Sequence, residues 1–138
     1  MSDNTELTAI SAIDGRYASK ASSLNPIVSE FGLIKYRVQV ECEWFLFLSD
    51  HEQISELPTV SSEDAKFVRN IAHDFSPADA VRVKAFERTT NHDVKAVEYF
   101  VKSKFNERPG LSMQSEWIHF CCTSEDINNT AYALMLKA

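Results

Sequence analysis

Glycine and proline are scarce in this sequence, whose 138 residues include three glycines and four prolines. Three glycines in a chain of this length are about a third of the average share. Because hairpins, bulges and tight turns depend on glycine, we do not expect a many-stranded sandwich or barrel. A helical domain needs few such turns, so the composition favours an all-α fold.

Long apolar runs and basic leaders are also missing. No stretch approaches the roughly 18 apolar residues that a membrane-spanning helix requires. The first ten residues hold two acids and no basic cluster, the reverse of a secretory or mitochondrial leader. With 14 Lys and Arg against 20 Asp and Glu, the net charge is −6. That balance argues against nucleic acid or an anionic membrane as the main partner.

Cysteine usage indicates a reduced protein. The three cysteines are Cys42, Cys121 and Cys122, and the geometry of the adjacent pair disfavours a disulfide between them. None belongs to a Cys-x-x-Cys or His-x-x-x-His pattern, and no HExxH motif is present, so we expect no metal site. We therefore expect a cytoplasmic chain.

Apolar residues recur at helical spacing through the first half of the sequence. Asn25 as N-cap and Pro26 in the first turn predict the start of a helix that ends near Asp50. Gly32 inside this helix indicates a close helix–helix contact. The stripe that defines the helix consists of Ile27, Phe31, Ile34, Val38, Cys42, Phe45 and Leu48.

Further helices are predicted by capping residues and apolar spacing. The expected spans are residues 61–73, 77–86, 94–105 and 124–138. Pro109 and Gly110 should stop the third of these. The last helix is apolar and has no stop signal, so we expect the chain to be cut inside a helix of a longer polypeptide.

Two polar clusters precede or interrupt these helices. Arg16 and Tyr17 follow a turn and could grip a phosphate, although a plain surface arginine explains the same residues. Residues 88–93 place His92 ahead of a helix, and simple capping by Asn91 or Thr90 is the alternative. In that alternative Asp93 lies in the first turn. Adjacent side chains do not face each other on a helix, so no relay between Asp93 and His92 is expected.

A third cluster opens the last predicted helix. Thr123 and Ser124 stand where free N–H groups and the helix dipole can hold an anion, and capping is compatible with that role. His119 lies beside Trp117 among aromatic residues, which favours a structural histidine.

At these clusters the sequence resembles the amino-terminal part of the adenylosuccinate lyase family, within the fumarase/aspartase superfamily. The stretches that carry the resemblance are residues 9–17, 36–41, 87–100 and 118–129. These stretches span nearly the whole chain in order. The last two, residues 87–100 and 118–129, are specific to the family. Lyases for argininosuccinate or fumarate share the fold but lack the Asp-Gly-Arg-Tyr opening. Family members of the matching bacterial type are about three times as long as this chain.

The resemblance implies an architecture and a reaction. Residues 1–112 would form the amino-terminal helical domain, and residues 113–138 the start of a long helical bundle. The family eliminates fumarate from adenylosuccinate, giving AMP, and from the succinyl-carboxamide imidazole ribotide of purine biosynthesis. The reaction is a β-elimination that uses no metal or organic cofactor. Active sites of the family form where subunits of a homotetramer meet.

The resemblance also implies three groups of substrate-binding residues. The nucleotide end would be held by Arg16 and Tyr17. The succinyl group would lie beside Asn91, His92 and Asp93, with a hydrogen bond from His92. A substrate carboxylate would bind at Thr123 and Ser124, with His119 near the pocket.

The family's general acid and serine base lie in segments that these 138 residues do not contain, an Arg-Thr-His segment and a Gly-Ser-Ser-x-Met-Pro loop. We therefore expect the chain alone to be inactive. Two alternatives stay open: a non-catalytic helical interaction module, in which Arg16, His92 and Ser124 are surface and capping residues, and another fumarate-releasing lyase such as argininosuccinate lyase.

Overall fold

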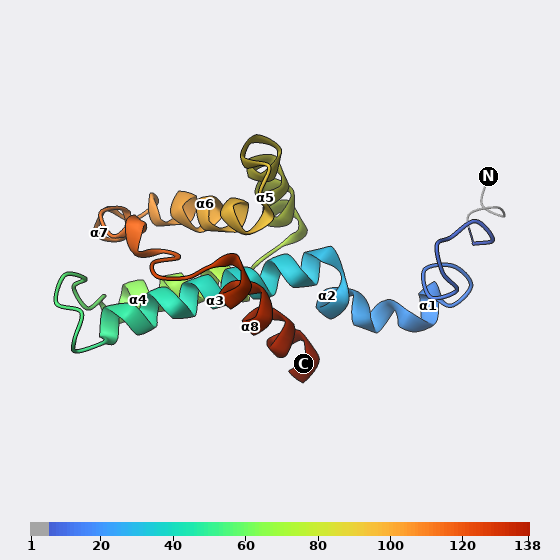
Figure 1. The fold of residues 1–138 in the computed structure, drawn as a ribbon, viewed down its shortest axis with the longest axis horizontal. Coiled ribbons are helices and arrows are strands. Elements are labelled where there is room, and N and C mark those ends of the chain that lie inside the picture. The colour runs from blue at the N-terminus through green and yellow to red at the C-terminus, as the bar shows by residue number, and fades with distance from the viewer. Residues whose placement is uncertain (1–5) are drawn as a thin grey trace.

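The structure is a computed structural model that describes residues 6–138, and this part of the chain is all-α, as expected, with no strand (Figure 1). The prediction about a leader falls partly on residues 1–5, which lie outside the described residues. The elements are α1 (Ala18–Ala21), η1 (Ser22–Leu24), α2 (Asn25–Val28), α3 (Glu30–Asp50), α4 (Ser62–His73), α5 (Pro77–Thr90), α6 (Asp93–Phe105), α7 (Pro109–Ser112), η2 (Ser115–Trp117) and α8 (Ser124–Lys137). Within residues 6–138, no helix combines the length and apolarity needed to cross a membrane.

The long helix α3 is the centre of the fold, and α4, α6 and α8 pack along it while α5 packs on α6 (Figure 1). The predicted apolar stripe is confirmed along α3, where its buried members are Ile34, Val38, Cys42, Phe45 and Leu48. Aromatic rings join the layers: Phe45 meets Phe105 of α6 edge to face at 4.8 Å, and Phe100 meets Phe75 at 5.6 Å. The core thus fixes α6 against α3.

The single helix expected from Asn25 to Asp50 is wrong, because the chain breaks at Ser29. Ser29 is extended (φ −73°, ψ 170°), and its hydroxyl accepts a hydrogen bond from the Gly32 N–H at 3.2 Å. Ser29 is therefore the N-cap of α3, a position that serine favours. Asn25 is the first residue of α2 rather than a cap. Because the apolar periodicity continues across Ser29, the sequence pattern does not reveal the break.

The close contact predicted at Gly32 is present, and it is made by the backbone of α2. A Cβ at this position would overlap the Ile27 carbonyl group and lie 2.9 Å from the Pro26 oxygen. We expect Gly32→Ala to lower the free energy of unfolding by about 1–3 kcal/mol, since backbone cannot yield as a side chain can. Gly110→Ala is the matched control, because nothing lies within 4 Å of its Cβ position. Urea denaturation of both variants checks this, and equal stabilities would contradict it.

Helices α4 and α5 begin where their caps predict, but α5 ends later than expected. Ser61 caps α4, and Ser76 forms a capping box with Asp79 at the start of α5. Helix α5 continues to Thr90 rather than Phe86, because Asn91 adopts a left-handed conformation (φ 51°) and ends the helix there.

The helix expected over residues 94–105 does end at Phe105, but Pro109 and Gly110, which the sequence predicts as its stop, lie beyond that end. Helix α6 ends at Phe105, and Pro109 begins the short helix α7. Proline lacks an N–H and so suits a first helical turn, where that donor has no partner within the helix.

Candidate functional site

Two of the predicted residue groups meet where the α5–α6 junction lies beside the start of α8. His92 Nε2 lies 3.4 Å from the Ser124 hydroxyl oxygen, although 32 positions separate these residues in the sequence. A cavity of about 360 Å³ borders the same junction and is lined in part by Arg37, Asn91, His92 and Asp93. The fold therefore assembles one polar rim from the residues around His92 and Ser124.

His92 is held in a defined tautomer by the helix that it caps. Its Nδ1 accepts a hydrogen bond from the Lys95 backbone N–H at 3.1 Å, which makes it the N-cap of α6. With Nδ1 acting as an acceptor, the neutral ring carries its proton on Nε2. The half-exposed ring thus presents an N–H donor toward Ser124. The capping alternative named Asn91 or Thr90, but Asn91 ends α5 and His92 is the cap.

Asp93 is paired with α3 rather than with its neighbour His92. Its Oδ2 lies 2.8 Å from an Arg37 guanidinium nitrogen, whereas Oδ1 lies 3.9 Å from His92 Nδ1. As expected, no Asp–His relay forms. Partial burial alone would raise the pKa of Asp93, but the Arg37 charge and the Val94 N–H hold the pKa below its ordinary value.

This lowered pKa predicts an acid-sensitive contribution to stability. A carboxyl group whose folded pKa is depressed stabilises the fold above its unfolded pKa, and that contribution is lost as the pH falls through the folded value. We expect the free energy of unfolding to decline as the pH is lowered below about 4, and to decline less steeply in Asp93→Asn. Urea titrations at a series of pH values measure both slopes, and identical slopes would contradict the prediction.

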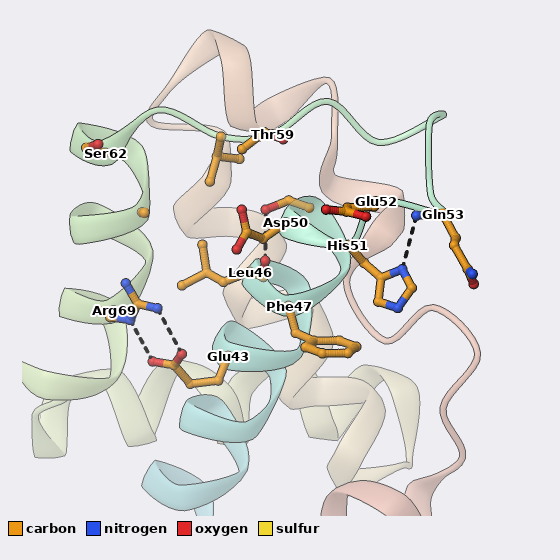
Figure 2. A pocket seen from close by; sticks show the side chains of 13 residues that line it. Glu43, Leu46, Phe47, Asp50, His51, Glu52, Gln53, Thr59, Ser62 and Arg69 are labelled. Carbon is orange, nitrogen blue, oxygen red and sulfur yellow. Dashed lines mark hydrogen bonds and ion pairs between the residues drawn. The ribbon is translucent and has the colours of Figure 1, made fainter.

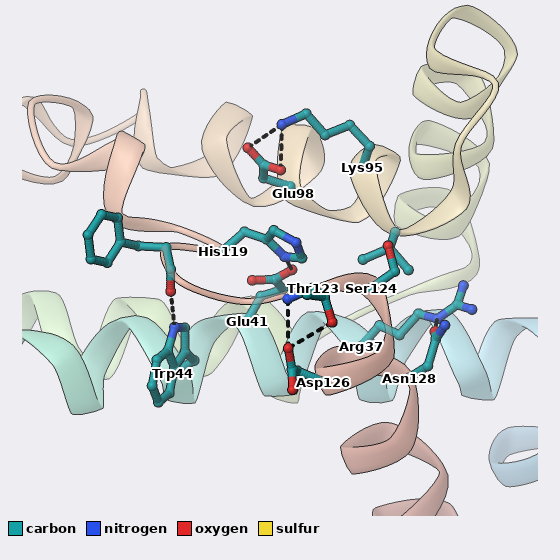
Figure 3. A network of polar contacts seen from close by, with 12 residues as sticks. Arg37, Glu41, Trp44, Lys95, Glu98, His119, Thr123, Ser124, Asp126 and Asn128 are labelled. Atoms are coloured by element: carbon teal, nitrogen blue, oxygen red, sulfur yellow. Dashed lines mark hydrogen bonds and ion pairs between the residues drawn. The ribbon is translucent and has the colours of Figure 1, made fainter.

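Arg37 connects three helices at this site, and Figure 3 shows its side chain beside Asn128 of α8. Its side chain is only 6% exposed, and besides Asp93 at the start of α6 it contacts α8, where Nε donates to Asn128 Oδ1 at 2.9 Å. Since Asp93 follows His92 and Asn128 lies one turn beyond Ser124, Arg37 holds the two site segments in register.

Two more polar side chains of α3 continue the line begun by Arg37, at helical spacings of four and three residues. Glu41 Oε1 lies 2.6 Å from His119 Nδ1, and Trp44 Nε1 donates to the Phe120 carbonyl at 2.8 Å (Figure 3). We call Arg37, Glu41 and Trp44 the polar ridge of α3. Sequence reasoning missed this ridge, although residues 36–41 form one of the stretches that carry the family resemblance.

At the start of α8, Thr123 serves the helix cap. Its backbone N–H and its hydroxyl both donate to Asp126, at 2.7 and 2.8 Å. These bonds lower the pKa of Asp126 and commit the Thr123 hydroxyl to the cap. Ser124 is the hydroxyl of the predicted pair that faces His92.

The structure does not bring Arg16 and Tyr17 to this rim. The Arg16 guanidinium lies over the Tyr17 ring, 4.9 Å from its centroid. Figure 1 shows their segment projecting from the helical body, at the opposite end of α3 from α7. Within this chain, the predicted nucleotide-binding pair and the His92–Ser124 pair are therefore separate.

A larger cavity lies elsewhere, at the carboxyl end of α3, and contains none of the predicted site residues. Its volume is about 780 Å³, and an ion pair at 3.0 Å between Glu43 and Arg69 forms one wall (Figure 2). A second cavity of about 590 Å³ is lined by residues of both α3 and α8, mainly apolar ones, Trp44 and Phe47 among them. In residues 6–138, no cluster of His, Cys, Asp or Glu side chains is arranged to hold a metal ion.

Comparison with known proteins places these features in a family. The sequence model of a family described as "Lyase" matches residues 15–138, a span that includes Arg16, His92 and Ser124. The chain belongs to this lyase family. The resemblance found in the sequence is thereby confirmed at the level of the family.

Curated relatives of this lyase-family chain are named adenylosuccinate lyase. That of Vibrio cholerae is 56% identical over 131 residues, which cover 95% of this chain and 29% of the relative. Those of Escherichia coli strain K12 and Haemophilus influenzae are 54% and 53% identical, over 96% and 95% of this chain and 29% of each relative. The lyase-family chain thus spans under a third of the length of these relatives.

Proposed function

We propose that this lyase-family chain is the amino-terminal, substrate-binding part of an adenylosuccinate lyase. The observation that carries the proposal is the meeting of His92, at the α5–α6 junction, with Ser124 at the start of α8. These residues lie in the two stretches most specific to that family, and relatives with that name match 95% of the chain. The parent enzyme would release fumarate from adenylosuccinate, leaving AMP, and from the succinyl-carboxamide imidazole ribotide.

The reaction is a β-elimination that needs positioning more than cofactors. A base removes the proton beside a carboxylate, the carbon–nitrogen bond breaks, and an acid protonates the leaving nitrogen. The Nε2–H of His92 suits a carboxylate oxygen of the succinyl group, and the Ser124 hydroxyl and the first-turn N–H groups of α8 suit another. Asn91 would line the same side. Because Asp93 is bound to Arg37, its role would be to hold this rim in place.

The proposal extends to organisation and assembly. Residues 1–112 would form the substrate-binding domain and residues 113–138 the start of a bundle shared by a cytoplasmic homotetramer of purine biosynthesis. The exposed Tyr132 and Leu136 of α8 suit further helix packing. The segment that carries Arg16 and Tyr17 extends from the helical body, which suits a nucleotide site completed by another subunit.

One observation favours the alternative of a non-catalytic interaction module. His92 caps α6 and Thr123 caps α8, so both residues have structural roles without a substrate. Fumarate release by the full-length polypeptide separates the two functions, since a module would turn over no substrate.

The test is fumarate release, followed by ultraviolet absorbance. The full-length polypeptide should cleave adenylosuccinate and leave argininosuccinate intact, and absence of cleavage would reject the proposed function. The 138-residue chain alone should release no fumarate, because a general acid and a general base typically contribute about 10²–10⁴-fold each. Fumarate release by the chain alone would contradict the expectation that these 138 residues lack the general acid and the general base.

A further inference from the structure

Glu41 is a carboxylate in an unusual place, on the buried face of the central helix. It is 0% exposed, its Oε1 lies 2.6 Å from His119 Nδ1, and its Oε2 has no hydrogen-bond partner. Burying a carboxylate with an unsatisfied oxygen costs stability, more than an apolar side chain of similar volume would. The role of Glu41 therefore lies in the segment that it binds through His119.

Through His119, Glu41 binds a loop whose backbone conformation is unfavourable. The segment between η2 and α8 contains two non-glycine residues in the left-handed region, His119 (φ 64°) and Cys121 (φ 58°). That region is unfavourable for such residues unless the surroundings fix them. The polar ridge supplies two tethers, from Glu41 to the His119 ring and from Trp44 to the Phe120 carbonyl (Figure 3).

This loop leads directly into the candidate site. Thr123 and Ser124 follow it, and the Ser124 hydroxyl meets His92 Nε2 at 3.4 Å. A loop that relaxed from its left-handed conformation would rotate the start of α8 and separate this pair. The buried carboxylate and the polar rim are thus joined by a few residues of backbone.

The charges around His119 favour a protonated ring. Glu41 faces it from α3, Glu98 and Lys95 from α6, and Asp126 from α8, so three carboxylates oppose one ammonium. The hydrogen bond to Glu41 raises the pKa of His119 against the effect of partial burial. Burial raises the pKa of Glu41, although the bond from His119 opposes the rise.

We propose that Glu41 is a positioning residue: by binding His119 Nδ1 it fixes the left-handed loop and so keeps Ser124 against His92. That this placement of Ser124 and His92 serves substrate binding rests on the proposed function. The pairing of Glu41 with His119 and its effect on the loop do not depend on that function.

The test is a titration of the histidine rings by ¹⁵N nuclear magnetic resonance, in the chain and in Glu41→Gln. The amide keeps the shape of the side chain and removes its charge. We expect the His119 midpoint to fall by about one pH unit or more, as for loss of an opposite charge in contact. The His92 ring and the Ser124 amide should shift as well. Glu43→Gln is the matched control, since Glu43 is on the same helix but exposed and paired with Arg69. An unchanged His119 midpoint in Glu41→Gln overturns the proposal.

A second variant probes the pair from the loop if Glu41→Gln does not fold. His119→Ala removes the partner at a loop position outside the main core, and it should displace the Ser124 and His92 signals while leaving those of α4 in place. Unmoved Ser124 and His92 signals overturn the proposal. The proposed function fails separately, since a full-length polypeptide without fumarate release would leave these titrations unchanged.

Discussion

Replacing His92 with alanine in the full-length polypeptide is expected to lower kcat by about 10²–10³-fold, the usual cost of removing one preorganised hydrogen-bond donor. The reason is that the His92 ring is held in one tautomer. Its Nδ1 accepts a hydrogen bond from the Lys95 N–H, so Nε2 presents a proton beside Ser124. The same change removes the N-cap of α6 and should cost about 1 kcal/mol of stability. Turnover should therefore suffer far more than folding.

His92→Asn separates the two roles, because asparagine is a strong N-cap and lacks the imidazole. We expect this variant to regain the stability lost in His92→Ala while its kcat stays low. Fumarate release and urea denaturation of the two variants give both quantities. If His92→Asn restored turnover together with stability, the cap alone would account for His92, and the capping alternative would be correct.

The sequence predicted what depends on neighbours along the chain. Ser61, Ser76 and Thr123 each start a helix where their capping pattern placed it, because a cap is satisfied by an N–H two or three residues away. The apolar spacing failed at Ser29, because it runs on through a break that the Ser29 cap and the close packing of α2 against Gly32 mark.

The candidate site depended on partners far apart in sequence. Glu41 finds its partner 78 positions away, and Trp44 finds its own 76 positions away, distances at which periodicity carries no information. The grouping of His92 with Ser124 came from the family resemblance, and the structure adds why they meet. For the polar ridge, the available signals were polar residues beside the apolar stripe of α3 and the family resemblance over residues 36–41.

The largest expected loss of stability at the site follows from the polar ridge. Arg37→Met keeps the volume of the buried side chain but removes its contacts with Asp93 and Asn128. We expect the free energy of unfolding to fall by about 2–3 kcal/mol, since hydrogen bonds to a charged group contribute about 1.5–3 kcal/mol. Asp93 is 53% exposed and can regain water, which keeps the loss below that of breaking a fully buried ion pair.

Arg69→Met is the matched control for that loss, because Arg69 makes an ion pair of similar length with Glu43 at the surface. An exposed pair contributes about 0–1 kcal/mol, so this variant should unfold nearly as the parent chain does. Arg37→Met should also separate the α6 and α8 segments and shift the His92 ring signal, which Arg69→Met should leave in place. Equal losses of stability in the two variants, with His92 unmoved in both, would mean that Arg37 does not hold the site in register, and that packing of α6 and α8 on α3 is sufficient to place His92 beside Ser124.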